Sequence, residues 1–231
     1  MTYPYVAKNV DDVWMMQDQP DRKNARKIEV VSHGISPEKA VEIVRKAGLG
    51  WHFLCDIHAP EADFQSIRLK YKALGYRALA TEWLFVHDLQ KIPNFKSAPP
   101  AVEIRDSEIL NSIQQRAKQK RRMVLNSRLF GVWDENQDIG WVRSIPVGKA
   151  SWVSDLVVYE SHRGKGYGRA LMSKLLQSDR KHGLERSVLL ASSDGARLYP
   201  HLGYQKIGVL QMFCPLKRSS PVPPAPSQDI Q

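Results

Sequence analysis

Three glycines stand close together where an apolar run ends and a helix-like pattern begins. The stretch from Arg163 to Arg169 reads RGKGYGR, so Gly164, Gly166 and Gly168 are separated by single residues. Each glycine loses more backbone entropy on ordering than any other residue would, which disfavours this composition inside a regular element. A bare backbone with exposed amide groups suits one chemistry well, the binding of a phosphate-bearing ligand.

The spacing excludes two familiar phosphate-binding motifs. The dinucleotide fingerprint G-x-G-x-x-G fails because Arg169 stands where its third glycine is required. The P-loop fails because Lys165 is followed by Gly166 instead of Ser or Thr. What remains is R-x-x-G-x-G between a strand and a helix, which directs backbone amides and the positive end of a helix dipole at one point. A pyrophosphate would fit there.

The stretch DLVVYESHRGKGYGRALMSKLL, residues 155–176, resembles the acetyl-CoA-binding motif of the GNAT superfamily of N-acetyltransferases. Downstream, SSDGARLYPHLGY at 192–204 is similar to the next signature of that family. Two signatures in the right order are more specific than either alone, and the resemblance covers roughly residues 101–217. One departure is visible, since Glu160 replaces a proline often found before the arginine.

The resemblance implies a GNAT-like acyl-CoA-binding fold and roles for particular residues. The backbone of Leu156, Val157 and Val158 would pair with the pantetheine arm in a splayed sheet. Seven residues of the loop would hold the pyrophosphate of acetyl-CoA: Arg163, Gly164, Lys165, Gly166, Tyr167, Gly168 and Arg169.

The resemblance also implies a direct transfer of an acetyl group from acetyl-CoA to a primary amine, on a small molecule or on a protein. Tyr199 would protonate the departing thiolate, because its ordinary pKa of ~10 keeps the hydroxyl protonated at neutral pH. A packed core aromatic is the alternative for Tyr199. For the base, the candidates are Asp155, Glu160 or ordered water. A non-catalytic acyl-CoA-binding or regulatory module is the alternative function.

Composition limits the other possibilities. The 231 residues are 42% hydrophobic and 25% charged, which is ordinary for a globular protein. No apolar run reaches the ~18–20 residues of a membrane span, the N-terminus lacks the order of a signal peptide, and the two cysteines fit a reducing compartment, so we expect a cytoplasmic protein without membrane contact. The net charge of +10 includes the basic stretch RAKQKRR at 116–122, which we interpret as a solvated helix end in preference to a nucleic-acid site.

Strand-like and helix-like segments alternate along the chain, which predicts a mixed α/β sheet. Ser36 and Pro37 mark a clear helix start. Helices are expected at 36–48, 61–74, 107–119, 168–183 and 195–203, and strands at 27–34, 51–57, 78–89, 102–105, 128–134, 138–145, 150–158, 186–193 and 204–213. The predicted organisation is an N-terminal α/β segment at 1–92 whose first 27 residues form an irregular arm, a linker at 93–100, the acetyltransferase domain at 101–217 and a disordered tail at 218–231.

Two further patterns involve the N-terminal segment. Y-x-x-L-G-Y occurs at 71–76 and again at 199–204, so residues 28–90 are either a degenerate copy of the C-terminal half or a chance likeness. His52, Cys55 and His58 resemble a metal trio, but a strand would direct Cys55 away from both histidines. We therefore expect no metal site, and interpret His52 and His58 as ordinary residues of a polar face.

Overall fold

The computed structural model describes residues 5–18, 28–93, 100–105, 108–109, 113, 126–134, 137–193 and 195–216. Contacts divide the chain into two compact units. Residues 83–207 form the C-terminal unit, and residues 2–82 together with 208–231 form the N-terminal unit. None of the helices in the described part of the chain has the length and apolarity needed to cross a membrane.

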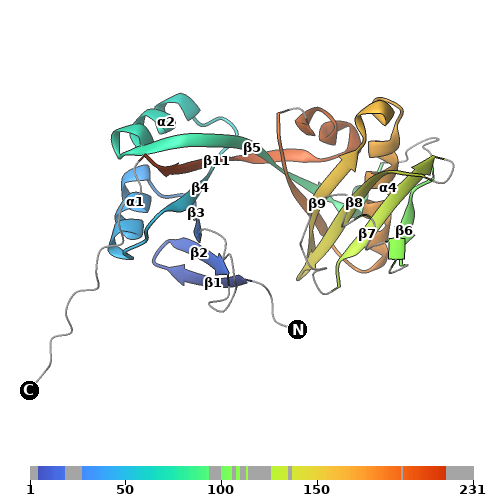
Figure 1. The fold of residues 1–231 in the computed structure, drawn as a ribbon, viewed down its shortest axis with the longest axis horizontal. Coiled ribbons are helices and arrows are strands. Elements are labelled where there is room, and N and C mark those ends of the chain that lie inside the picture. The colour runs from blue at the N-terminus through green and yellow to red at the C-terminus, as the bar shows by residue number, and fades with distance from the viewer. Residues whose placement is uncertain are drawn as a thin grey trace, which may run out of the picture. The chain divides into compact units, whose positions relative to one another are not determined.

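The elements follow one another in an α/β order, as Figure 1 shows. The strands are β1 Tyr5–Val10, β2 Val13–Asp18, β3 Ile28–His33, β4 His52–His58, β5 Tyr76–Asp88, β6 Val102–Ile104, β7 Arg128–Asp134, β8 Gln137–Val147, β9 Ala150–Val158, β10 Arg186–Ala191 and β11 Gln205–Pro215. The α-helices are α1 Pro37–Lys46, α2 Phe64–Ala73 and α4 Tyr167–Lys181. Short 3-10 helices are η1 Leu89–Lys91, η2 Glu160–His162, η3 Gly195–Arg197 and η4 Tyr199–Leu202.

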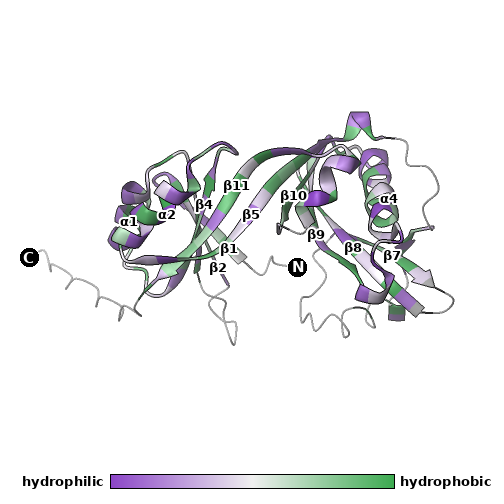
Figure 2. Ribbon diagram, turned by 90° about the horizontal axis from the view of Figure 1, so that it is seen from above, coloured by the Kyte–Doolittle hydropathy of each residue, from purple (hydrophilic) through white to green (hydrophobic). Residues whose placement is uncertain are grey.

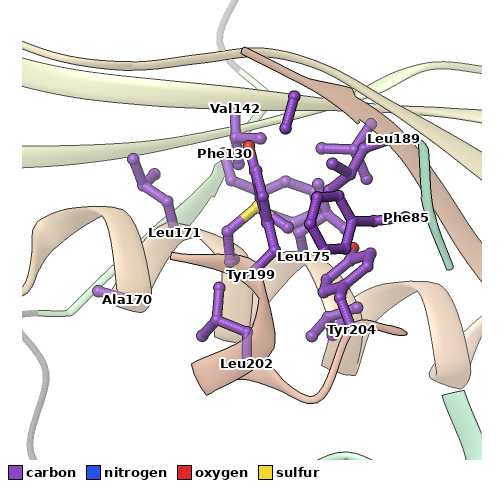
Figure 3. Packing of buried hydrophobic residues seen from close by; sticks show 14 of the residues in the cluster. Phe85, Phe130, Val142, Ala170, Leu171, Leu175, Leu189, Tyr199, Leu202 and Tyr204 are labelled. Carbon is purple, nitrogen blue, oxygen red and sulfur yellow. The ribbon is translucent and has the colours of Figure 1, made fainter. Parts of the chain in front are cut away.

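In the C-terminal unit the strand order is β5-β10-β9-β8-β7-β6. Strand β10 is parallel to β9, whereas β5 and β10, β9 and β8, β8 and β7, and β7 and β6 pair in antiparallel fashion. Helix α4 packs its apolar side on the sheet through residues such as Leu171, Leu175 and Leu176, which are fully buried. Figure 3 shows this core, to which Leu175, Tyr199 and Phe85 belong.

In the N-terminal unit the order is β1-β2-β3-β4-β11-β5, with β3 parallel to β4. Ser36 caps α1 by accepting a hydrogen bond from the Lys39 amide at 3.2 Å, which confirms the predicted helix start. Helices α1 and α2 pack on one face of this sheet, around Tyr71 and Phe213. Figure 2 shows hydrophilic and hydrophobic positions on these helices, as expected where one side of a helix covers a core.

The last strand of each half of the chain crosses from one unit to the other. Strand β5 begins in the N-terminal unit, and its residues Trp83–Asp88 pair with β10 in the C-terminal unit. Strand β11 begins in the C-terminal unit, and its residues Val209–Phe213 pair with β4 in the N-terminal unit. Each unit is therefore completed by a strand from the other half of the chain.

Two local predictions were wrong. The stretch expected as an irregular N-terminal arm contains the hairpin β1–β2, in which Val10 pairs with Val13 across a turn where Asp11 has a φ of 51°. The α-helix expected at 195–203 is a pair of 3-10 helices, and Pro200 near the start of the second removes an amide donor. The basic stretch at 116–122, most of the helix expected at 107–119, the linker's residues 94–99 and the tail at 218–231 lie outside the described residues.

Candidate functional site

The glycine loop joins β9 to α4, as its sequence predicts. Gly164 has a φ of 77° and Gly166 a φ of 88°, both in the left-handed region that residues with a Cβ rarely adopt. A Cβ placed on either residue would meet no atom within 4 Å. Backbone conformation therefore favours glycine at both positions, and the space in front of both residues is open.

Helix α4 begins at this loop without a side-chain cap. Gly166 is its N-cap residue, and it has no side chain that could accept a hydrogen bond from the first turn. The amide groups of the first helical turn have no partner within a helix, and the helix dipole adds a partial positive charge there. Lys165 and Arg169 add basic side chains to the same turn, while the Arg163 Nε donates to the carbonyl oxygen of Val158 at 3.1 Å. The loop can therefore attract and hydrogen-bond an anion.

Beside the loop, β9 separates from β10. The two strands pair only from Ala150 to Trp152 on β9 and from Arg186 to Val188 on β10, although both continue for several described residues. On its other edge β9 stays paired with β8 as far as Val158, which lies opposite Gly140. The edge of β9 that carries Leu156, Val157 and Val158 is thus released from β10.

The separation coincides with a bulge in β9. The register between β8 and β9 shifts between Trp141 and Arg143, and Asp155 has a φ of 58°. A left-handed residue in a strand turns the chain out of regular pairing. The Asp155 carboxylate lies 3.3 Å from the Ser154 hydroxyl oxygen and 3.7 Å from Nη1 of Arg143, whose side chain is buried. Sequence analysis missed Arg143; its only signal was a cation inside an otherwise apolar strand pattern.

Tyr199 lies at the start of η4, in the core drawn in Figure 3. Its ring centroid is 5.6 Å from those of Phe85 and Tyr204. Burial raises the pKa of Tyr199 to about 12, so the hydroxyl keeps its proton over the whole physiological range. A Cβ on Gly168 would lie 3.6 Å from Leu198, the residue before Tyr199, so the start of α4 lies close to the start of η4. The glycine loop, the bulge at Asp155 and Tyr199 therefore belong to one unit of the fold. Glu160, the other candidate base, is exposed in η2.

The two histidines of β4 have structural partners, and Cys55 is a buried free thiol. His52 lies 2.7 Å from the carbonyl oxygen of Gly50 and 2.9 Å from the Tyr76 hydroxyl, and His58 lies 3.2 Å from a carboxylate oxygen of Asp56. Burial raises the pKa of the Cys55 thiol to about 12. No group of three described His, Cys, Asp or Glu side chains could hold a metal ion. The interpretation of His52 as a residue of a polar face was wrong, because its side chain is buried.

Comparison with known proteins gives the same family that the sequence resembles. Residues 126–206 match the model of the acetyltransferase (GNAT) domain. The fold is similar to a GCN5-related N-acetyltransferase from Kribbella flavida, with a TM-score of 0.65, 13% identity and coverage of 92% of this chain and 90% of that one. It is also similar to a GCN5-related N-acetyltransferase from Sphaerobacter thermophilus, with a TM-score of 0.56, 14% identity and coverage of 91% and 82%.

A tandem GNAT protein from the clavulanic acid biosynthesis pathway matches with a TM-score of 0.54 and 14% identity, covering 90% of this chain and 80% of that one. At these identities the likeness shows a shared fold. No curated protein matches the sequence. The predicted mixed α/β fold and the resemblance to the GNAT superfamily are confirmed.

Proposed function

We propose, for a chain whose residues 126–206 match the model of the acetyltransferase (GNAT) domain, that it transfers an acetyl group from acetyl-CoA directly to a primary amine. The observation that carries this proposal is the uncapped start of α4 behind Gly166, beside the separated edge of β9. An anion site at a helix start and a released strand edge suit the two parts of a CoA molecule, its pyrophosphate and its amide-rich arm.

The loop residues fit the cofactor in several ways. Gly164 and Gly166 hold left-handed conformations with open space in front of them. Backbone amides of the loop from Arg163 to Arg169 would bind the pyrophosphate. Leu156, Val157 and Val158 would offer backbone groups to the pantetheine arm. Bound acetyl-CoA would supply the thioester.

In the transfer step the amine nitrogen forms a bond to the acetyl carbonyl carbon, and the carbon–sulfur bond breaks. Tyr199 would give its hydroxyl proton to the departing sulfur. Because burial raises the pKa of Tyr199 to about 12, this acid stays protonated over the whole physiological range. Asp155 is the proposed acceptor of the proton that the amine loses.

A non-catalytic acyl-CoA-binding module is the second candidate, because the N-terminal unit has the parallel strand pair without the glycine loop. Incubation with acetyl-CoA and a panel of primary amines, with free thiol measured against time, separates the two. Amine-dependent thiol release supports the acetyltransferase. Tight acetyl-CoA binding without thiol release for any amine supports the binding module.

A further inference from the structure

In the C-terminal unit, side chains alternate strictly across three neighbouring strands. Phe85 on β5, Leu189 on β10 and Val153 on β9 are buried in the core with α4. Because successive residues of a strand point to opposite faces, their neighbours lie on the side of the sheet away from this core. These neighbours are half-buried, and most of them are apolar.

The strand register places four of these apolar side chains in one row across four strands. Ile145 pairs with Trp152, Trp152 with Val188, and Val188 with Val86. Neighbouring strands of a sheet lie about 4.7–4.9 Å apart, so the four side chains form a continuous apolar stripe. Two residues further along each strand, on the same face, Leu190 of β10 pairs with Leu84 of β5 and widens the stripe.

The stripe ends where β9 and β10 separate. Trp152 and Val188 are the last pair between these two strands, so Leu190 has no paired residue of β9 beside it. The bulge at Asp155 follows three residues after Trp152. On β10 and β5 the apolar surface therefore reaches the strand opening at which the acyl group would be held, through Leu190 and Leu84, while on β8 and β9 the polar pair of Arg143 and Ser154 borders the opening.

We propose that this stripe, formed by Ile145, Trp152, Val188, Val86, Leu190 and Leu84, binds the apolar body of the acceptor, which makes the acceptor a hydrophobic primary amine with an alkyl or aryl group. The inference rests on the proposed acetyl transfer. Each buried methylene gains free energy by leaving water, whereas a polyhydroxylated amine such as an amino sugar would leave its hydroxyls unpaired on this surface.

The position of the stripe favours an acceptor over a second copy of the chain. Its side chains are half-buried and adjoin the strand opening, whereas an apolar residue that protrudes from the same sheet, Val147 at the end of β8, is 66% exposed. A second copy resting on the stripe would make the oligomeric state depend on these residues.

The test uses the full chain with acetyl-CoA and linear primary amines from propylamine to hexylamine, with phenylethylamine and glucosamine for comparison. We expect kcat/KM to rise by about fourfold per added methylene, the factor that burial of one methylene supplies, and glucosamine to be the poorest acceptor. The double variant Val86→Thr/Val188→Thr keeps β-branched shapes in both strands and adds hydroxyls. Its kcat/KM should lose most of this dependence on chain length.

Val147→Thr is the matched control, because it makes the same change on an exposed part of the sheet. It should keep both the rate and the chain-length dependence. An unchanged dependence in the double variant would overturn the proposal, as would a wild-type protein that acetylates all amines equally well. If sedimentation shows that the wild-type protein is a dimer and the double variant is not, while the chain-length dependence stays intact, the stripe would bind a second copy of the chain. Absence of thiol release with every amine would instead overturn the acetyltransferase proposal itself.

Discussion

The ring of Phe213 stacks on that of Tyr71, with centroids 4.0 Å apart and planes inclined by 29°. A corresponding contact occurs in the other unit, where the ring centroids of Phe85 and Tyr199 are 5.6 Å apart and the planes are inclined by 45°. Tyr199 follows Tyr71 by 128 residues, and Phe213 follows Phe85 by the same number. Each motif tyrosine therefore packs against a phenylalanine from the closing strand of the other half of the chain.

This reciprocal packing supports the proposal that residues 28–90 are a degenerate copy of the C-terminal half. The second tyrosines of the two Y-x-x-L-G-Y motifs also correspond, because the hydroxyl of each contacts a polar side chain of a strand. The Tyr76 hydroxyl lies 2.9 Å from a nitrogen of His52, and the Tyr204 hydroxyl lies 2.7 Å from the Ser187 hydroxyl oxygen. In a strand-exchanged duplication, the closing strands β5 and β11 would each complete the opposite copy.

The two units differ at the position that matters for a cofactor. Strands β3 and β4 pair along six positions, from Ile28 with His52 to His33 with Ile57, while β9 and β10 pair along three. The Tyr71 hydroxyl donates to the buried carboxylate of Asp56 at 2.7 Å. We therefore predict that one molecule of acetyl-CoA binds per chain, and that titration calorimetry of the full chain gives a stoichiometry near one. A stoichiometry near two would contradict this.

Gly166 tests the cofactor loop. Its φ of 88° costs a residue with a Cβ roughly 1–2 kcal/mol. Gly166→Val should therefore reshape the start of α4 and weaken acetyl-CoA binding by at least tenfold, measured by calorimetry on protein shown to be folded by circular dichroism.

The matched control is Gly148→Ala in the turn between β8 and β9, where φ is 57° and a Cβ also meets nothing within 4 Å. This variant carries a similar backbone strain away from the loop. It should lose stability and keep its affinity for acetyl-CoA. Equal affinity losses at Gly148 and Gly166 would mean that the loop has no special role.

Local signals in the sequence predicted the parts of this structure that depend on local chemistry. Ser36 and Pro37 marked the start of α1, and the spacing of Gly164 and Gly166 marked a loop of bare backbone before α4, because capping and glycine spacing are properties of a few adjacent residues. The row from Ile145 to Val86 could not be predicted, because it depends on the register of four strands. The exchange of β5 and β11 depends in the same way on pairing between distant parts of the chain.

Asp179 tests how the C-terminal unit tolerates a buried charge. Its carboxylate is fully buried in α4, contacts the guanidinium of Arg128 and accepts a hydrogen bond from Ser144 at 2.7 Å. Burial raises the pKa of Asp179, although Arg128 and the hydrogen bond from Ser144 oppose that rise. The native state thus binds the Asp179 proton more tightly than the unfolded chain does. The stability that the protonated Asp179 contributes falls as pH rises from about 4 through the native pKa.

Arg128→Met removes the cation and should raise the pKa of Asp179 further. We expect a loss of about 3–5 kcal/mol in the free energy of unfolding at pH 8, because a buried charge is left without its partner, and a smaller loss at pH 5. Urea denaturation at both pH values measures this. Arg105→Met, which removes an exposed arginine 3.4 Å from Glu103, should change stability by no more than about 0.5 kcal/mol. If Arg128→Met lowers the free energy of unfolding equally at both pH values, the effect does not arise from the charge of Asp179.

Asp155 combines an unusual backbone conformation with a candidate chemical role, and one substitution separates them. Asparagine tolerates a φ near 58° better than most residues, so Asp155→Asn keeps the bulge while it removes the basic carboxylate. If Asp155 accepts the amine proton, kcat should fall by about 10²-fold or more, with unchanged affinity for acetyl-CoA. A fully active Asp155→Asn enzyme would leave Asp155 with a conformational role only.

Tyr199→Phe tests the proposed acid, because it keeps the ring contacts with Phe85 and Tyr204 and removes the one proton that Tyr199 could give to sulfur. We expect kcat to fall by about 10²–10⁴-fold while acetyl-CoA affinity changes little, since the hydroxyl acts mainly in the transition state. A pKa of about 12 also means that loss of this proton should not limit the wild-type rate below pH 10.

Tyr71→Phe is the matched control, and its expected result differs in kind. The Tyr71 hydroxyl donates to the buried Asp56, so its removal should lower the free energy of unfolding by about 1–3 kcal/mol. Turnover by the folded protein should stay near the wild-type value, because the N-terminal unit has neither the glycine loop nor the separated strands. Steady-state kinetics and urea denaturation on both variants therefore give opposite patterns if Tyr199 is the acid. Normal turnover by Tyr199→Phe would identify Tyr199 as a core aromatic. Equal losses of turnover in the two variants would mean that the proposal places catalysis in the wrong half of the chain.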